Sequence, residues 1–152
     1  DEGSPEYFYY PQAWREPYIG RRRETGFGLY GLLGIDRHDG PAVQAYRVLN
    51  YQFFGAPVAL FFTIDRDMEQ GSWVDYGMFL QSLMLAAREQ GLETCAQAAF
   101  CPYYDSVMPI LGAPSEQMLV CGMSIGYADP DAVINEYRTS RLPVDVFRTR
   151  LS

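Results

Sequence analysis

The sequence predicts a single domain of the α+β class, with the sheet and its helices stacked as in three-layer α/β proteins. Two observations support this prediction. Three short apolar runs have the length of buried strands, and segments of helical length lie between them. Apolar residues make up 48% and charged residues 20% of the 152 residues, which is typical of a globular domain with its own core.

Residues 1–20 are expected to form an extended arm. They are rich in Tyr, Pro and Glu and show no helical period. The arm carries too many aromatic side chains for a free tail, so it is expected to pack against its own domain or against a partner subunit. The run Arg21, Arg22 and Arg23 that follows is interpreted as a solvated helix face, with a ligand-binding role as the alternative.

Two helices are expected before the first strand. The apolar spacing over residues 26–34 allows a helix, although the glycines in this stretch weaken it. A better helix opens at Gly40, because Asp39 can cap it and Pro41 suits the first turn.

The apolar run 57–63 predicts a buried central strand, and the clearest helix is expected to start at Ser72. Ser72 and Asp75 resemble a capping box, and Gly91 is a natural C-terminal stop. Residues 73–87 are apolar on nearly every face, which indicates contact with the core and with another subunit. Further strands are expected at residues 92–98 and 117–125, with a shorter helix from Pro102 to Gly112 between them.

Composition excludes several classes of function. The net charge of -7 argues against a nucleic-acid or anionic-membrane surface. The sequence contains no lysine, which excludes a P-loop lysine and a Schiff base. Three cysteines without close-pair spacing and the lone His38 predict no metal site and a reducing, cytoplasmic location.

Arg138 and Arg141 are the first candidates for a functional site. They lie three positions apart, just before Leu142 and Pro143. A guanidinium group is planar, permanently charged and well suited to bind phosphate. In so acidic a chain, a local arginine pair indicates one particular phosphate group rather than a polyanion.

Several segments, taken in order, resemble the FMN-dependent nitroreductase family, and most closely its 4-nitrobenzoate-reductase-like subgroup. Each segment is weak alone, but their order and spacing are fairly specific. The resemblance covers essentially the whole chain and is carried by residues 9–11, 28–31, 71–81, 86–95, 97–100, 120–128 and 135–141.

The resemblance implies a homodimer that binds FMN at the subunit interface. NADH or NADPH would reduce the flavin, which would pass electrons to a nitroaromatic, a quinone or a similar acceptor. The long apolar helix would be the family's dimer-forming helix. Because the flavin does the redox chemistry, the resemblance assigns no catalytic side chain to this chain.

The resemblance also assigns residues of a cofactor site. Arg138 and Arg141 match the clamp on the FMN phosphate. Ala98 and Ala99 match the segment whose backbone amides approach the flavin ring, and Ala96 and Gln97 match the strand end beside it. Three aromatic side chains are candidates for lining the acceptor pocket, with packing in the core as the alternative: Phe27, Tyr30 and Trp14.

The family's N-terminal portion, which supplies a helix and further flavin contacts, is not in this sequence, so the domain is expected to be N-terminally incomplete. Two alternatives therefore stay open. One is a flavin enzyme of another chemistry, such as reductive dehalogenation. The other is a non-catalytic flavodomain that depends on a partner chain.

Overall fold

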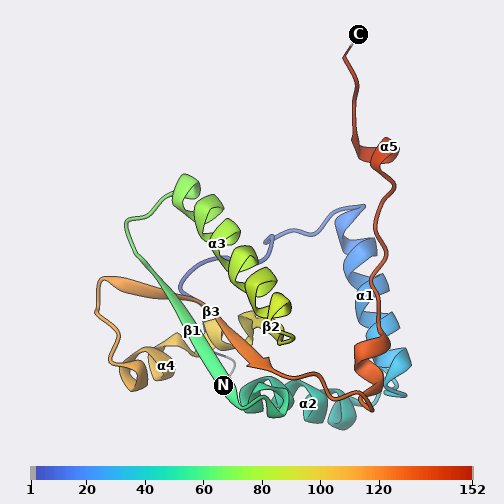
Figure 1. The fold of residues 1–152 in the computed structure, drawn as a ribbon, viewed down its shortest axis with the longest axis horizontal. Helices are drawn as coiled ribbons and strands as arrows, with labels where there is room; N and C mark the ends of the chain where they lie inside the picture. Colours follow the sequence, from blue (N-terminus) through green and yellow to red (C-terminus); the bar gives the residue numbers. More distant parts are fainter. Residues whose placement is uncertain (1–2, 152) are drawn as a thin grey trace.

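The computed structural model describes residues 3–151, so residues 1, 2 and 152 of the expected domain and arm lie outside it. Its centre is an antiparallel sheet with the strand order β1-β3-β2 (Figure 1). The strands are β1 (Val58–Asp65), β2 (Glu93–Gln97) and β3 (Gln117–Gly126). These bounds confirm the three strands that the apolar runs predict. β3 carries more of the buried residues than any other element, because it lies between the other two strands.

A bulge interrupts the pairing of β1 with β3. Phe62 lies opposite Cys121, but the next residue, Thr63, lies opposite Leu119. Val120 is therefore an extra residue in β3, and its carbonyl is released from the regular ladder. The bulge is where the N-terminal arm docks: the hydroxyl of Tyr7 donates to the Val120 carbonyl oxygen at 2.7 Å.

Helix α3 (Gln70–Glu89) lies across one face of the sheet (Figure 1). Trp73, Tyr76 and Leu80 pack against the core cluster formed by Phe62, Ile64 and their neighbours on β3. The expected start at Ser72 is wrong, since the helix begins two residues earlier and its N-cap, Glu69, makes no side-chain hydrogen bond. The Ser72 hydroxyl contacts the Met68 sulfur at 3.4 Å instead of capping the helix.

The sequence predicts that α3 contacts both the core and another subunit, and the structure gives the exposure of its side chains within one chain. Within this chain no residue of α3 is fully buried. Val74, Met78 and Leu85 are 63%, 57% and 61% exposed, and their spacing of four and seven places them on one stripe opposite the sheet. The predicted stop is confirmed, because Gly91 follows the helix with φ of +75°, a conformation that suits glycine.

The other face of the sheet is covered by η2 (Ala98–Tyr103) and α4 (Tyr104–Leu111). Phe100, Met108 and Leu119 form the second core cluster there. A helix start at Pro102 is wrong, because a 3-10 turn already begins directly after β2 and contains Pro102. Gly122 of β3 lets the Phe100 ring approach closely, since a Cβ on this glycine would lie 2.7 Å from the ring.

Helices α1 (Tyr18–Leu32) and α2 (Gly40–Val48) lie to one side of the sheet (Figure 1). Asp39 caps α2 as predicted, accepting a hydrogen bond from the Ala42 amide at 3.0 Å. The 3-10 segment η1 (Leu49–Gly55) then leads into β1. Within it Phe53 and Phe54 have φ of 51° and 53°, which is costly for bulky side chains.

The chain ends lie along the outside of this core. Residues 3–17 form no long helix or strand, and α1 begins slightly before the expected end of the arm. After β3 the chain forms η3 (Val133–Glu136) and α5 (Val144–Phe147) and runs beside α1 (Figure 1). Among the described residues, no helix has the length and apolar character needed to cross a membrane.

Candidate functional site

The end of β2 and the start of η2 form the first part of the candidate site. Gln97 is 2% exposed, and its amide nitrogen donates to the Asn50 carbonyl oxygen at 2.8 Å. This bond ties η1 to the strand end. The Gln97 side-chain oxygen is buried and has no hydrogen-bond partner among the described residues, so it is an acceptor available to a bound group.

Ala98 and Ala99 follow as the first two residues of η2 and are half-buried. The first amides of a helical turn have no partner within that turn, and two methyl side chains leave the main chain approachable. The Ala99 carbonyl accepts a hydrogen bond from the Tyr51 hydroxyl at 3.3 Å, which fixes the turn. Ala96 is exposed, so the segment 96–99 passes from surface to core within one turn.

Aromatic rings pack around Phe100, which follows Ala99 in η2. Phe100 contacts Phe53 with ring centroids 5.0 Å apart in a stacked arrangement. Phe61 of β1 meets Phe100 edge to face at 5.1 Å. Because the Phe100 ring also packs on Gly122, the position of Ala98 and Ala99 depends on a tight aromatic contact with the sheet.

The structure places Arg138 and Arg141 elsewhere. The segment that carries them lies beside α1, where the Ser140 hydroxyl donates to Glu24 at 2.9 Å and the Tyr137 hydroxyl donates to the Thr25 carbonyl at 3.0 Å. Figure 1 shows this stretch leading away from β2. Within one chain, the predicted phosphate clamp and the predicted ring-contacting turn therefore do not form one cavity.

Both arginines of the pair are exposed, and their hydrogen bonds are local. Arg138 donates to the carbonyls of Asn135 and Tyr137, at 2.6 and 3.0 Å. Arg141 donates to the Thr139 hydroxyl and to the Ser140 carbonyl. Neither forms an ion pair within the described part of the chain, so both guanidinium charges remain available for an anion.

Two of the three predicted acceptor-pocket residues lie together. Phe27 and Tyr30 of α1 line a cavity of about 280 Å³ between α1 and α2. Trp14 lies outside it, and its ring packs under the Arg22 guanidinium at 4.7 Å from the centroid. Four arginines also line this cavity, a feature that the sequence does not reveal: Arg22, Arg23, Arg37 and Arg47.

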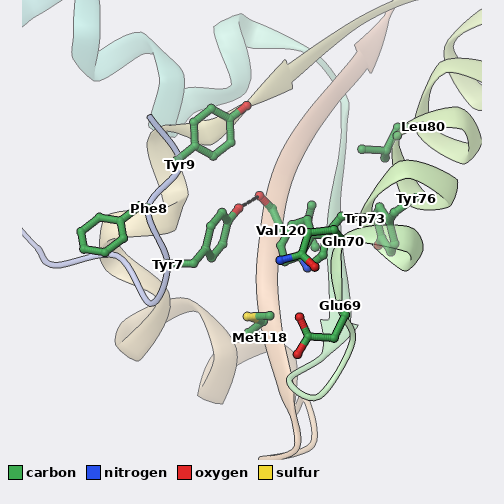
Figure 2. Close-up of a pocket in the computed structure, with 11 residues that line it drawn as sticks. Tyr7, Phe8, Tyr9, Glu69, Gln70, Trp73, Tyr76, Leu80, Met118 and Val120 are labelled. Carbon is green, nitrogen blue, oxygen red and sulfur yellow. Dashed lines mark hydrogen bonds between the residues drawn. The ribbon is translucent and has the colours of Figure 1, made fainter. Parts of the chain in front are cut away.

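A larger cavity, of about 540 Å³, separates the N-terminal arm from α3 (Figure 2). Tyr7 and Trp73 both line it and contact each other, with ring centroids 5.0 Å apart. Its walls are mainly aromatic and apolar, with Glu69 and Gln70 at the start of α3. None of the residues that the sequence assigns to a cofactor or acceptor site lines this cavity.

The two buried cysteines do not form a reactive centre. All three are free thiols, and Cys101 and Cys121 are buried. Burial raises the pKa of Cys121 to about 11, with a smaller contribution from the nearby Cys101. Burial also raises the pKa of Cys101, whose thiol donates to the Val120 carbonyl at 3.2 Å. A thiol that keeps its proton is a poor nucleophile, so these residues act as packing groups.

The sheet with helices on both faces superposes on solved nitroreductases, so the fold is nitroreductase-like. The nitroreductase family model matches residues 12–127. The chain belongs to the nitroreductase family, as its sequence motifs predict.

Named relatives and solved structures agree with this assignment. A 4-nitrobenzoate reductase of Pseudomonas putida is 44% identical over 131 residues, which are 86% of this chain and 58% of the relative. A chloronitrobenzene nitroreductase of Comamonas testosteroni is 39% identical over 145 residues, covering 95% and 64% of the two chains.

A solved FMN and NADPH-dependent nitroreductase, NfnB from Sphigopyxis sp. strain HMH, superposes with a TM-score of 0.95 at 38% identity and covers 99% of this chain and 67% of its own. NfnB from Mycobacterium smegmatis, solved with NADPH, gives 0.91 at 31% identity with the same coverage. The chain spans less than two thirds of the curated relatives it matches.

Proposed function

We propose that the whole protein is an FMN-dependent oxidoreductase that takes electrons from NADH or NADPH and passes them to nitroaromatic compounds or quinones. The observation that carries this proposal is the β2–η2 turn, where Gln97 offers a buried free acceptor beside the amides of Ala98 and Ala99. The flavin supplies the hydride chemistry when it is bound. The chain's own part is to orient a flat ring and to keep water from it.

The donor set of the chain fits FMN in two respects. A flavin ring presents both hydrogen-bond donors and acceptors along one edge, and the turn offers a buried amide oxygen and main-chain N–H groups to such an edge. The phosphate requires cationic donors, and Arg138 and Arg141 have no carboxylate partner among the described residues. Both halves of the proposed site are therefore chemically suitable, although they lie apart in one chain.

We infer that the protein is a homodimer with the cofactor at the interface between copies. The stripe of Val74, Met78 and Leu85 on α3 supports this, because large apolar side chains more than half exposed indicate an interaction surface. In such a dimer, Arg138 and Arg141 of one copy could lie closer to the β2–η2 turn of the other copy than they lie to the turn of their own chain. The free thiols agree with the cytoplasmic location that forms part of this proposal.

The test uses the whole protein, purified and examined for flavin absorbance. The expected result is a yellow protein whose absorbance bleaches on adding NADPH and returns on adding a nitroaromatic acceptor. Replacing Arg138 and Arg141 together by Ala should weaken FMN binding at least tenfold, whereas Arg150→Ala, an exposed arginine in the C-terminal tail, should leave it unchanged.

Three other results would change the conclusion. Bleaching without reduction of any nitro compound would favour a flavin enzyme of another chemistry, such as dehalogenation. A colourless protein that takes up no FMN would favour the non-catalytic, partner-dependent flavodomain. Unchanged FMN affinity in the double variant would remove the phosphate clamp from the proposal while leaving the rest.

A further inference from the structure

The cavity between α1 and α2 combines four positive charges with an apolar floor. Arg22 and Arg23 approach it from α1, Arg37 from the following loop and Arg47 from the last turn of α2. Phe27, Tyr30, Ile19 and Val43 supply the apolar lining. No acidic side chain lines this cavity, in a protein whose net charge is -7.

These arginines are not neutralised by carboxylates. The ion pairs of the described residues join Arg66 to Glu6, Arg88 to Glu93 and Arg148 to Asp145, and none involves the cavity. The nearby acids act elsewhere: Asp39 caps α2 and Asp36 accepts from the His38 amide at 2.8 Å.

Two of the four guanidinium groups are held by aromatic rings instead. Arg22 lies over Tyr10 and Trp14, with its guanidinium carbon 5.4 and 4.7 Å from the ring centroids. Arg37 lies 5.5 Å from the Phe27 centroid and donates to the His38 ring at 2.9 Å. Such contacts orient a cation without cancelling its charge. Arg23 and Arg47 make no side-chain hydrogen bond or ion pair in residues 3–151, which leaves their donors open to a ligand.

We propose that this cavity binds an organic anion that carries an aromatic ring. The ring would pack against Phe27 and Tyr30, and the anionic group would accept hydrogen bonds from Arg23 and Arg47. Guanidinium groups suit carboxylate and phosphate equally, because both present paired oxygens to the planar fork. A volume of about 280 Å³ fits a small ring with its substituents rather than a whole dinucleotide.

Two sources could supply such an anion to a nitroreductase. One is the carboxylate of a nitroaromatic acid serving as the electron acceptor. The other is the 2′-phosphate that distinguishes NADPH from NADH, next to its adenine ring. Naming these sources rests on the proposed function, but the binding of an aromatic anion does not.

The first experiment therefore measures binding without turnover. Isothermal titration of the whole FMN-loaded protein uses benzoate against neutral benzamide, and adenosine 2′-phosphate against adenosine. In each pair the anion should bind at least tenfold more tightly than its neutral counterpart, and raising the salt concentration should reduce the difference. Preference for benzoate assigns the cavity to the acceptor, and preference for adenosine 2′-phosphate assigns it to the donor nucleotide; both support the proposal.

Matched variants locate the binding. Arg23→Gln combined with Arg47→Gln should remove at least nine tenths of the anion's advantage and leave benzamide and adenosine unchanged. Arg150→Gln removes a charge of the same sign in the C-terminal tail and should change nothing. Anions that bind no better than their neutral counterparts, or equal loss in the control variant, would overturn the proposal.

A second measurement separates this inference from the proposed function. The reduction of neutral nitrobenzamide at saturating NADPH reports the oxidoreductase activity alone, because weaker binding of NADPH then leaves the rate unchanged. The double variant should raise the KM for a nitrobenzoate or for NADPH, whereas Arg150→Gln should keep both KM values and the kcat for nitrobenzamide. Unchanged KM values for both anions would contradict the cavity assignment with the activity intact. Absence of any reduction would remove the proposed function, whereas the titrations would still decide the binding site.

Discussion

The hydroxyl of Tyr7 donates a hydrogen bond of 2.7 Å to the carbonyl oxygen of Val120, 113 residues later in the chain. The acceptor belongs to the bulged residue of β3, whose carbonyl is not needed by the neighbouring strand. The same oxygen also accepts from the Cys101 thiol. Burial raises the pKa of Tyr7, so this residue stays a neutral donor across the physiological range. One bulge therefore anchors both the arm and the η2 turn.

Removing this hydroxyl should loosen the arm without unfolding the domain. Tyr7→Phe keeps the ring against Trp73 and loses the hydrogen bond, leaving the Val120 carbonyl to the weaker thiol donor. We expect a loss of about 1 kcal/mol in the free energy of unfolding and faster proteolytic cleavage before Tyr18. Tyr10→Phe is the control, since Tyr10 is 55% exposed. Equal cleavage rates in the two variants would show that the hydroxyl does not hold the arm.

The contact of Phe100 with Gly122 provides a test of how closely the core is packed. A methyl group on Gly122 would lie 2.7 Å from the Phe100 ring, which is held between Phe53 and Phe61. Gly122→Ala should therefore destabilise the protein by roughly 1–3 kcal/mol, measured by urea unfolding. In the whole protein it should also weaken FMN binding, because the shifted ring moves the turn at Ala98.

Gly31→Ala is the matched control for this substitution. Gly31 lies in α1, and a methyl group added there would meet no atom within 4 Å. The same change at this position should stabilise the protein by up to about 1 kcal/mol, because alanine favours a helix over glycine. A loss of stability at Gly31 that matches the loss at Gly122 would contradict the packing argument.

The exposed stripe of α3 predicts the behaviour of the assembly. Met78→Glu places a charge in the centre of the stripe formed with Val74 and Leu85, and should convert the expected dimer into monomers in sedimentation velocity. Ile110→Glu is the control: it adds the same charge on α4, at a side chain that is 85% exposed on the other side of the sheet. A dimer that survives M78E would place the interface elsewhere.

The buried thiol of Cys121 predicts a dependence of stability on pH. Its pKa rises from 9.0 to about 11 in the folded protein, so between these values the unfolded chain loses the proton and the folded chain keeps it. The stabilising contribution is complete below pH 9 and is lost as the pH rises through 11. The free energy of unfolding should therefore fall over this interval.

Cys121→Ala should flatten this fall between pH 9 and pH 11, although it lowers stability at every pH by leaving a small cavity. Tyr127→Phe, at a side chain that is 79% exposed, should keep the wild-type slope. Unfolding free energies from urea titrations at half-unit pH steps measure both slopes. An unchanged slope in C121A would assign the pH dependence to other groups, such as Tyr76, whose pKa burial raises to about 12.

Strands and helix ends that depend on local patterns could be predicted from the sequence. The apolar runs indicate all three strands, and the Asp39 cap and the Gly91 stop lie where turn chemistry places them. The start of α3 could not be predicted, because its N-cap Glu69 makes no capping hydrogen bond that a sequence pattern could reveal, whereas Ser72 and Asp75 have the spacing of a capping box.

Part of the candidate site could likewise be predicted from the sequence, and part of it could not. Gln97, Ala98 and Ala99 occupy one turn because they are neighbours in sequence, and Phe27 and Tyr30 share a helix face at a spacing of three. Two relationships depend on tertiary structure alone. Asn50 reaches Gln97 only because η1 turns back through two phenylalanines with positive φ, and Arg47 joins Arg23 only because α2 folds beside α1.

The order β1-β3-β2 has a consequence for how copies of this chain associate. Each outer strand pairs on one side only within residues 3–151, so both flanks of the sheet present unmatched amide and carbonyl rows. Such rows readily accept another extended segment. The chain should therefore tend to self-associate through its sheet, and a peptide able to align with either flank should reduce this association.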